Sequence, residues 1–436
     1  MTDGTAAETF GVSGGRALVG SVRAPGDKSI SHRALLLAAL ADGASTITGL
    51  SDGDDVRRTL EAVRAVGAEV EESAASVGVR GGRSRLHAPG GPIDLGNSGT
   101  GMRLLLGLLA GLPVTAQLTG DDSLRSRPMD RVAQPLGLMG AEVTGQGPRC
   151  LPPVTITGGA LHGIEYTPPM ASAQVKSALL LAGLAADGDT VVHEPVPTRA
   201  HTEELLAQMG ADIAVSTSAA GRTITVRRSP LHPTVVVVPG DPSQAAFWVV
   251  GGLVVPRSVV SVEGTYLGAE RTGFINVLQR MGGQVTVDAQ GAGHGSVTAR
   301  SSALTGTVIH AEEIPSLDEV PILAVAAAVA SGESRFVDVG ELRVKESDRL
   351  GGTVDLVTAF GGTAHIDGDD LVISGSGRLH PAAIDARGDH RMAMAAAIAG
   401  AACPSATDLT TISGWETVQS SYPRFAEDLE TLSVAG

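Results

Sequence analysis

Apolar and polar positions along the chain follow two recurring patterns. In the first, an apolar helix ends in Gly-Ala or Gly-Gly and residues that alternate between apolar and polar follow, as in LGLMGAEVTGQ and LQRMGGQVTVD. Glycine just after a helix favours the left-handed conformation that ends it, and the alternation is typical of a strand. The first glycine of the pattern occurs at Gly67, Gly140, Gly210, Gly282 and Gly361. We expect a sixth copy at FAEDLETLSV, residues 425–434.

The second pattern is a polar loop followed by a helix built of alanine, leucine, valine and glycine. Its copies are GDKSISHRALLLAALADG, GNSGTGMRLLLGLLAG, MASAQVKSALLLAGLAADG, GDPSQAAFWVVGGLVV, SLDEVPILAVAAAVASG and GDHRMAMAAAIAGAA. These helices are apolar on nearly every side, so we expect them to be buried. Strands that alternate with helices in this way predict an α/β architecture of repeated units.

The repeats group into two sets of three. VRAPGDKSISHRALLLAAL in the first half resembles VVVPGDPSQAAFWVVGGLV in the second, because each predicts a strand, a Pro-Gly-Asp turn and a buried helix. We therefore predict one domain at residues 24–240 and another formed by an N-terminal strand, 10–23, with residues 241–436. The links at 23–27 and 238–241 are short, and we expect them to act as hinges.

Composition limits the classes of partner. The formal net charge is −15, which disfavours non-specific binding to nucleic acid or to an anionic membrane. Aromatic residues are only 3% of the chain, which leaves few platforms for base stacking. Two cysteines cannot form a disulfide framework and indicate a reducing, cytoplasmic setting. We expect Cys150 and Cys403 to be buried, and we expect no signal peptide and no membrane span.

The starts of the six apolar helices carry most of the unusual polar residues. They are Lys28, Ser29 and Arg33; Asn97, Ser98 and Thr100; Ser172, Gln174 and Lys176; Asp241 and Ser243; Asp318; and His390 and Arg391. Helix N-termini that face one crevice would bind anions, although serine, asparagine and aspartate there are often simple N-caps. Capping does not explain Lys28 or Arg391, because a cation opposes the helix dipole. These two residues are the strongest indication of a bound anion.

Further cations lie close to these helix starts. They are Arg125, Arg127 and Arg131, then Arg199, and finally Arg343, Lys345 and Arg349, with Glu346 and Asp348 between them. If KESDR is helical, Lys345 and Arg349 share a face, and a solvated helix start with internal ion pairs is the alternative interpretation. Histidine and cysteine spacings fit no metal site, and glycine-rich NSGTGMR is a weak indication of phosphate binding. We predict no metal and no cofactor.

Taken together, six segments resemble the family of 5-enolpyruvylshikimate-3-phosphate synthases. They are PGDKSISHRALLLAAL, GNSGTGMR, LTGDDSLRSRPM, SAQVKSALLLAGL, RVKESDRL and GDHRMAMA, and they run in family order between about residues 22 and 425. The resemblance implies an alpha-beta prism fold, classed as α+β in some schemes. Its two similar domains each contain three βαβαββ units, and two hinge strands join them. We also expect the protein to be a monomer.

The resemblance implies transfer of the enolpyruvyl group of phosphoenolpyruvate to the 5-hydroxyl of shikimate 3-phosphate, with release of phosphate. The family reaction proceeds by addition and elimination through a tetrahedral intermediate, leads towards chorismate and the aromatic amino acids, and is the target of glyphosate. Each substrate carries a phosphate and a carboxylate. Arginine suits bidentate contact with such groups and lysine suits a point-charge contact, so four anionic groups account for the cations.

The resemblance also implies a role for each matching residue. Phosphoenolpyruvate would be bound by Lys28, Arg127, Gln174, Arg349 and Arg391, with Gly99 lining its site. Shikimate 3-phosphate would be bound by Lys28, Ser29, Arg33, Ser172, Gln174, Arg199, Asp318 and Lys345. Asp318 would orient or deprotonate the 5-hydroxyl. Glu346 would move the proton at the methylene carbon, and Lys28 would assist the leaving phosphate. Closure of the two domains would exclude water.

Three positions depart from some relatives. Many have Ser-Ser-Gln where this chain has Ser172-Ala173-Gln174, and Arg199 is expected to compensate for the missing hydroxyl. Ser420 stands where many have a lysine, so we assign no phosphate ligand there. Gly99 leaves room beside the phosphoenolpyruvate site, which predicts ordinary sensitivity to glyphosate.

Three other functions are compatible with parts of this pattern. UDP-N-acetylglucosamine enolpyruvyl transferases share the fold but use a loop cysteine, and GDDSLRSRPMD has none. RNA 3′-phosphate cyclases share a related repeat, but the acidic charge and the scarcity of aromatic residues disfavour that activity. A non-catalytic anion-binding protein of the same fold would have a gap in the charged set. Here Lys28, Asp318, Glu346, Arg349 and Arg391 are all present.

Overall fold

The computed structural model describes residues 8–291, 293–314 and 316–434, which form two compact units. We call Gly26–Val238 the N-terminal unit, and the described residues up to Pro25 and from Pro239 onwards the C-terminal unit. The chain therefore passes between the units at Pro25–Gly26 and at Val238–Pro239. The sequence placed these links at 23–27 and 238–241.

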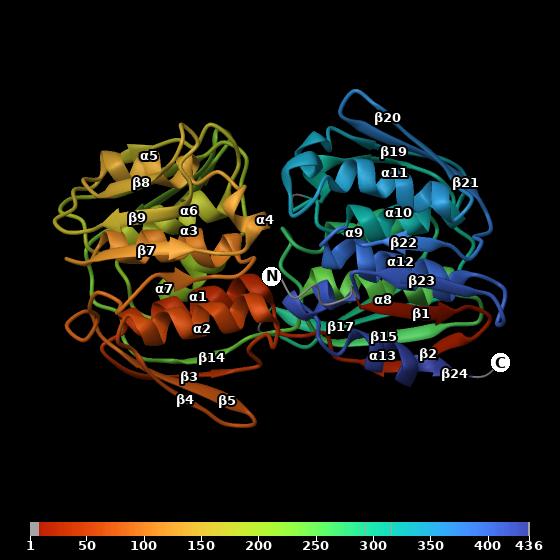
Figure 1. The fold of residues 1–436 in the computed structure, drawn as a ribbon, viewed down its shortest axis with the longest axis horizontal. Helices are drawn as coiled ribbons and strands as arrows, with labels where there is room; N and C mark the ends of the chain where they lie inside the picture. The colour runs from red at the N-terminus through yellow and green to blue at the C-terminus, as the bar shows by residue number, and fades with distance from the viewer. Residues whose placement is uncertain (1–7, 292, 315, 435–436) are drawn as a thin grey trace, which may run out of the picture. The chain divides into compact units, whose positions relative to one another are not determined.

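Three buried helices form the centre of the N-terminal unit. They are α1 (Lys28–Leu40), α3 (Gly99–Ala110) and α6 (Ala173–Gly183), and α3 packs against both others (Figure 1). A Cβ atom on Gly107 of α3 would lie only 2.3 Å from the Ala178 carbonyl oxygen of α6. The close approach of these two helix backbones therefore requires glycine at this position.

Three mixed four-stranded sheets enclose these helices, in the orders β14–β3–β5–β4, β6–β7–β9–β8 and β10–β11–β13–β12. The strands are β3 (Gly43–Thr48), β4 (Glu69–Glu72), β5 (Ser76–Gly81), β6 (Ile93–Asp94), β7 (Thr115–Thr119), β8 (Glu142–Gln146), β9 (Leu151–Thr157), β10 (Glu165–Tyr166), β11 (Thr190–Glu194), β12 (Ile213–Ser218), β13 (Gly221–Val226) and β14 (Val235–Val237). The other helices are α2 (Asp54–Ala65), α4 (Asp122–Arg125), α5 (Asp130–Leu138) and α7 (His201–Gln208). In each sheet one outer pair is parallel and the other two pairs are antiparallel.

The C-terminal unit repeats this plan around three more buried helices. They are α8 (Pro242–Val254), α10 (Val320–Val329) and α12 (His390–Ala402), and each packs against the other two. The sheets have the orders β16–β17–β15–β2–β24, β18–β19–β21–β20 and β1–β23–β22. The strands are β1 (Thr9–Ser13), β2 (Ala17–Val22), β15 (Val259–Tyr266), β16 (Gln284–Ala289), β17 (His294–Arg300), β18 (Val308–His310), β19 (Ser331–Val337), β20 (Thr363–Asp367), β21 (Asp370–Ser376), β22 (Ala383–Asp385), β23 (Leu409–Ser413) and β24 (Ser433–Val434). The remaining helices are α9 (Gly273–Arg280), α11 (Arg349–Ala359) and α13 (Phe425–Leu432), with 3₁₀ turns η1 (Ala311–Glu313), η2 (Gly340–Val344) and η3 (Trp415–Ser420).

The repeat plan of the sequence is confirmed in this order of elements. Residues 93–157 run β6–α3–β7–α4–α5–β8–β9, which is the βαβαββ unit with one short extra helix. The two units resemble each other in this plan, and the mixed α/β fold agrees with the predicted class. In the first sheet of the N-terminal unit, one of the two outer strands is β14. It pairs in parallel with β3, although it lies almost two hundred residues further along the chain.

The five glycines of the first pattern have the expected backbone conformation. Their φ angles are all positive, between 79° and 107°. A Cβ atom at four of them would also meet the ring of a histidine: His87, His162, His232 or His380. The predicted sixth copy is present as α13 followed by β24.

Two local predictions are wrong. The single N-terminal strand predicted at 10–23 is two strands in different sheets, because Gly14 and Gly15 turn the chain beside Cys403. Strand β1 begins at Thr9, and residues 1–7 lie outside the described residues. Cys403 is buried as expected, but Cys150 is only half-buried.

Candidate functional site

At the starts of the buried helices in the N-terminal unit, cationic side chains contact carboxylate, hydroxyl and carbonyl oxygens. Lys28 is the first residue of α1, and the Asp27 side chain caps this helix by accepting from the Ile30 amide at 2.8 Å. The Lys28 ammonium pairs at 2.9 Å with Asp55, in the first turn of α2. Both side chains are less than one-fifth exposed, at 17% and 11%. Asp55 therefore holds the ammonium group in one position, and the sequence analysis did not find this carboxylate.

Gly99, at the start of α3, lies between two guanidinium groups. A Cβ atom there would be 3.1 Å from Nη1 of Arg103 and 3.3 Å from Nη1 of Arg127. Arg127 donates to the Asn97 side chain at 2.5 Å and to the Ser123 hydroxyl at 3.1 Å. A methyl group at this position would crowd both guanidinium groups, which gives the predicted importance of Gly99 a steric basis.

Arg103 is a candidate binding residue that the sequence analysis missed. It donates to Oε1 of Gln174 at 2.7 Å, and Nε2 of Gln174 donates to the Thr100 hydroxyl at 2.8 Å. These contacts connect the start of α3 to the start of α6 and include the predicted ligand Gln174. The signal was available in the sequence, because Arg103 is the one charged residue in GTGMRLLLGLLA.

Arg33 lies in α1, five residues after its first residue, and is almost fully buried, with 2% of its surface exposed. Its guanidinium group donates to the hydroxyls of Thr202 and Ser177 at 2.7 Å each and to the Ser29 carbonyl at 2.8 Å. Arg199 donates to the Ser29 hydroxyl at 2.8 Å. The structure thus brings the predicted residues Ser29, Arg33 and Arg199 together. The Arg33 guanidinium group already donates hydrogen bonds to three groups of the protein.

Two residues at the start of α6 differ in their surroundings. The Ser172 hydroxyl accepts from the Val175 amide at 3.3 Å, so Ser172 is the N-cap of this helix. Lys176 is fully buried and pairs with Glu194 and Glu203. The sequence grouped Lys176 with the polar residues of the helix start, but the structure places it inside the unit.

His32 is buried between α1, α2 and α3 and remains neutral at physiological pH. Its ring lies 2.8 Å from the Thr59 hydroxyl and 3.4 Å from the Ser98 hydroxyl, which caps α3. Burial, followed by the nearby charges of Lys28 and Arg33, lowers the pKa of His32 well below its ordinary value of 6.5. The unfolded chain therefore takes up a proton at this residue at a higher pH than the folded chain does.

This shift predicts that acidification destabilises the fold through His32. Because the pKa of His32 is lower in the folded protein, the contribution of this neutral side chain to the free energy of unfolding is present in full above pH 6.5. It is lost as the pH falls below 6.5, where the unfolded chain binds the proton more readily. Between about pH 7.5 and about pH 5.5 the free energy of unfolding should therefore fall because of this group. Urea unfolding at both pH values measures the fall. His32→Gln should show a smaller fall than the parent, and an equal fall in the two proteins would contradict the assignment.

In the C-terminal unit, Arg349 is the centre of the charged cluster. It is the first residue of α11 and has no exposed surface. Its guanidinium group pairs with Asp389 at 2.7 Å, with Asp318 at 3.1 Å and with Glu346 at 2.6 Å. Burial by itself lowers the pKa of Arg349, but these three carboxylates outweigh it and raise the pKa above its ordinary value. Burial by itself raises the pKa of Asp389, but the charge of Arg349 outweighs burial and holds this pKa below its ordinary value.

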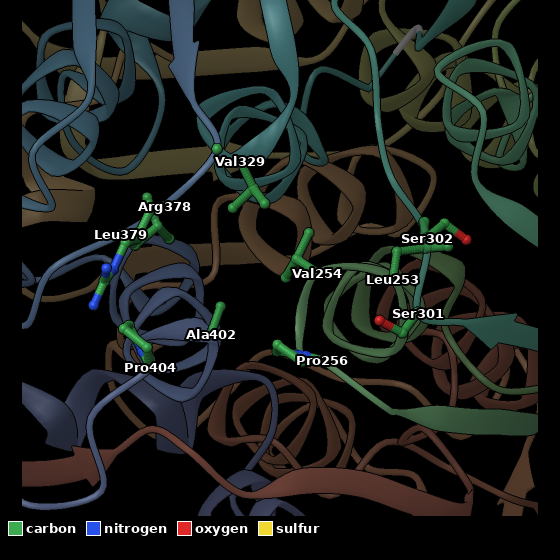
Figure 2. Close-up of a pocket in the computed structure, with 11 residues that line it drawn as sticks. Leu253, Val254, Pro256, Ser301, Ser302, Val329, Arg378, Leu379, Ala402 and Pro404 are labelled. Carbon is green, nitrogen blue, oxygen red and sulfur yellow. The ribbon is translucent and has the colours of Figure 1, made fainter.

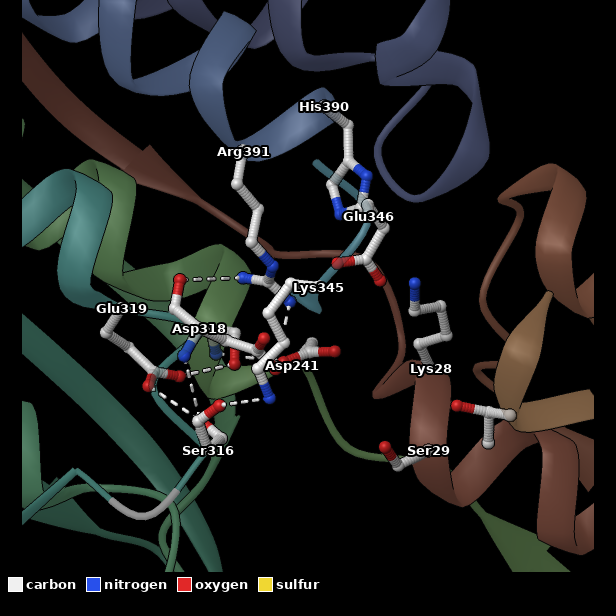
Figure 3. Close-up of polar contacts among 12 residues, drawn as sticks. Lys28, Ser29, Asp241, Ser316, Asp318, Glu319, Lys345, Glu346, His390 and Arg391 are labelled. Atoms are coloured by element: carbon white, nitrogen blue, oxygen red, sulfur yellow. Dashed lines mark hydrogen bonds and ion pairs between the residues drawn. The ribbon is translucent and has the colours of Figure 1, made fainter. Parts of the chain in front are cut away.

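Asp389 and Asp318 extend this cluster to Arg391. Asp389 caps α12 by accepting from the Arg391 amide at 2.9 Å, and it also accepts from the Ser347 hydroxyl at 3.0 Å. The Arg391 guanidinium group lies 3.4 Å from the Asp318 carboxylate and donates to the Asp318 carbonyl at 3.3 Å (Figure 3). The predicted residues Asp318, Arg349 and Arg391 are therefore in direct contact.

The local structure around Lys345 differs from the helix that the sequence suggested. Residues 345–348 lie between η2 and α11, so KESDR is not one helix and Lys345 and Arg349 do not share a helical face. The Lys345 ammonium donates to the Ser316 carbonyl at 3.4 Å (Figure 3). It also lies 3.4 Å from the Glu341 carboxylate. Arg125 and Arg343 are exposed, and neither residue takes part in the contacts described above.

A pocket of about 290 Å³ in the C-terminal unit is not part of this cluster. It is lined by the last residues of the three buried helices, Val254, Val329 and Ala402 (Figure 2). The charged cluster lies at the opposite end of α12, and a helix of 13 residues spans roughly 20 Å. Among the described residues, no group of histidine, cysteine, aspartate and glutamate is arranged to hold a metal ion, and no helix could cross a membrane.

Known proteins match this chain along nearly its whole length. The family model described as EPSP synthase (3-phosphoshikimate 1-carboxyvinyltransferase) matches residues 12–429. The chain is 46% identical over 425 residues to the 3-phosphoshikimate 1-carboxyvinyltransferase of Caulobacter vibrioides, a match that covers 95% of each chain. It is 44% identical over 432 residues to the protein of the same name from Desulforudis audaxviator, covering 97% of this chain and 99% of that relative.

Solved structures give the same result. An EPSP synthase structure from Acinetobacter baumannii superposes with a TM-score of 0.85 at 39% identity, covering 98% of both chains. The enolpyruvyl transferase NikO from Streptomyces tendae superposes with a TM-score of 0.76 over 98% of both chains, but at 22% identity this likeness concerns the fold alone.

Proposed function

The chain belongs to the EPSP synthase family, and on this basis we propose that it binds and converts phosphoenolpyruvate and shikimate 3-phosphate through the residues described above. The enzyme transfers the enolpyruvyl group of phosphoenolpyruvate to the 5-hydroxyl of shikimate 3-phosphate and releases phosphate. The observation that carries the residue assignments is the gathering of cations at the starts of α1, α11 and α12, in a chain with a formal net charge of −15. Helix N-termini and fixed guanidinium groups favour phosphate and carboxylate ligands.

In the N-terminal unit, we assign the phosphate of phosphoenolpyruvate to Lys28, Arg103 and Arg127, which lie at or near helix starts. The phosphate of shikimate 3-phosphate is assigned to Ser29 and Arg199, whose side chains already touch each other. Arg33 orients Ser29 through its carbonyl, while Ser172 and Gln174 are assigned to shikimate 3-phosphate from the start of α6.

In the C-terminal unit, Arg349 and Arg391 are assigned to the carboxylate of phosphoenolpyruvate, and Lys345 to shikimate 3-phosphate. Both arginines carry carboxylate partners in the structure, so a substrate carboxylate that pairs with Arg349 competes with Glu346 for the guanidinium group. Binding of the substrate thus gives Glu346 freedom to act on the reacting carbon.

The addition step requires an acid and a base. The 5-hydroxyl oxygen bonds to C2 of phosphoenolpyruvate, and its proton passes to Asp318. Glu346 takes up a proton from water once the substrate carboxylate has displaced it from Arg349, and it delivers this proton to the methylene carbon, which becomes a methyl group. In the elimination step Glu346 takes back a proton from that methyl group as the bond from C2 to the phosphate oxygen breaks. Lys28 stabilises the negative charge on the departing phosphate, which takes up the proton held by Asp318, so that both carboxyl groups return to their starting states.

Phosphate release with defined substrates tests the proposal. Phosphate should appear from phosphoenolpyruvate when shikimate 3-phosphate is present, and the organic product should be 5-enolpyruvylshikimate 3-phosphate. UDP-N-acetylglucosamine in its place should give no phosphate above background. Phosphate release with the nucleotide sugar instead, or with neither acceptor, would overturn the proposal. A cytoplasmic location, a monomeric state and the absence of macromolecular partners stay predictions.

A further inference from the structure

Lys176 stands apart from the predicted substrate ligands. It lies in α6, has no exposed surface, and pairs with Glu203 at 2.7 Å and with Glu194 at 3.0 Å. Both glutamates are themselves only 4% exposed. Burial of three charged groups carries a large desolvation cost, and well-packed apolar side chains in their place are often at least as stable. A role in stability alone is therefore a weak explanation for this cluster.

The cluster holds the segment 195–200, which joins β11 to α7. The Lys176 ammonium donates to the main-chain carbonyl of Arg199 at 3.0 Å. Glu194, the last residue of β11, accepts from the Thr198 hydroxyl. On the other side, Arg222 of β13 donates to the Thr198 carbonyl at 3.0 Å. These contacts fix the main chain at Thr198 and Arg199 from three different elements.

The segment held in this way presents Arg199 to the start of α1. The Arg199 guanidinium group donates to the Ser29 hydroxyl at 2.8 Å, and Arg33 donates to the Ser29 carbonyl at 2.8 Å. The position of the Arg199 side chain therefore depends on a main chain whose carbonyl is bound by Lys176. A guanidinium group binds phosphate well only when it is held in place beforehand, because otherwise binding must also order the side chain.

We propose that Lys176 is a positioning residue for shikimate 3-phosphate. With Glu194 and Glu203 it fixes the segment 195–200, so that Arg199 is held ready for the phosphate of this substrate. The inference rests on the proposed function, because it takes Arg199 as a ligand of shikimate 3-phosphate. It assigns no contact between Lys176 and the substrate.

Calorimetric titration with shikimate 3-phosphate, together with steady-state kinetics, tests this role. Lys176→Met should raise the dissociation constant and the KM for shikimate 3-phosphate about tenfold, by analogy with the loss of a charged hydrogen bond. The kcat at saturating shikimate 3-phosphate and the KM for phosphoenolpyruvate should change by less than about twofold, since Lys176 is not assigned to either. A general loss of folded structure would lower kcat instead.

A second variant guards against simple unfolding. In Lys176→Met/Glu203→Gln one positive and one negative charge are removed together, so the net charge of the cluster is unchanged while the donor to the Arg199 carbonyl is lost. The same rise in KM is expected for this variant. Leu118→Ala, in β7 of the same unit, is the matched control: it removes a fully buried side chain, should lower stability, and should leave the KM for shikimate 3-phosphate unchanged.

A double-mutant cycle with Arg199→Gln decides between this role and others. If Lys176 acts through Arg199, adding Lys176→Met to Arg199→Gln should weaken binding by less than about twofold more. Additive effects, or an unchanged dissociation constant in Lys176→Met, would overturn the inference. Arg199→Gln with unchanged affinity would overturn it too, by removing Arg199 as a ligand. Failure of the proposed function is distinguishable from these results, since the parent protein would then not bind shikimate 3-phosphate at all.

Discussion

Lys28→Met should lower kcat/KM by about 10²–10³-fold while leaving the protein folded, which is the scale measured when one preorganised hydrogen-bond donor is removed from a reaction site. Methionine keeps the unbranched shape of the side chain and removes the ammonium group that we assign to phosphoenolpyruvate and its leaving phosphate. The Lys28–Asp55 ion pair is also lost. Asp55 lies in the first turn of α2, where the partial positive charge of the helix N-terminus favours a carboxylate. We therefore expect only a small change in stability.

Steady-state kinetics and thermal unfolding measure these two effects. Arg57→Met is the matched control in the same unit, because it also removes one cation and one ion pair, but Arg57 is 58% exposed and pairs with Glu72 outside the cluster. It should leave kcat/KM within about twofold of the parent, as expected for an exposed pair. Loss of folding in Lys28→Met would make Lys28 a structural residue, and retention of most of the activity would remove it from the mechanism.

Arg349→Met should cause the largest loss of stability, together with loss of turnover. The substitution leaves Asp389, Asp318 and Glu346 without the guanidinium group that pairs with all three. Removing one partner of a buried ion pair costs about 3–5 kcal/mol. For a unit of this size, that loss corresponds to a decrease in Tm of roughly 6–20 °C. Differential scanning calorimetry measures the decrease.

Arg335→Met separates the effect of burial from the loss of charge. Arg335 also pairs with two carboxylates, Asp367 at 3.0 Å and Asp370 at 2.7 Å, but it is 34% exposed. Its loss should cost no more than about 1 kcal/mol. Asp389→Asn should partly rescue Arg349→Met, because asparagine keeps the cap of α12 and removes the unpaired charge. Equal losses in Arg335→Met and Arg349→Met would show that burial does not set the energy of these pairs.

The order of the elements and the class of fold could be predicted from the sequence because both depend on local rules. Gly67 and its four counterparts end helices through a left-handed conformation that glycine adopts easily, and their spacing revealed the repeats. Helices that are apolar on every side must be buried, and α8 has all 13 of its residues buried. The same patterns predict the polar helix starts, and with them the positions of Lys28, Ser172 and Arg391.

What the sequence alone determined is therefore the repeats, the buried helices and the presence of cations at their starts. The tertiary structure decided which of these side chains meet. Lys176 is held inside by two glutamates, and Arg33 donates to Thr202, which is 169 residues away along the chain. Likewise, Asp389 pairs with Arg349 from 40 residues away. Helix and turn rules depend on neighbours within a few residues, whereas these ion pairs depend on the packing of distant segments, which no local spacing records.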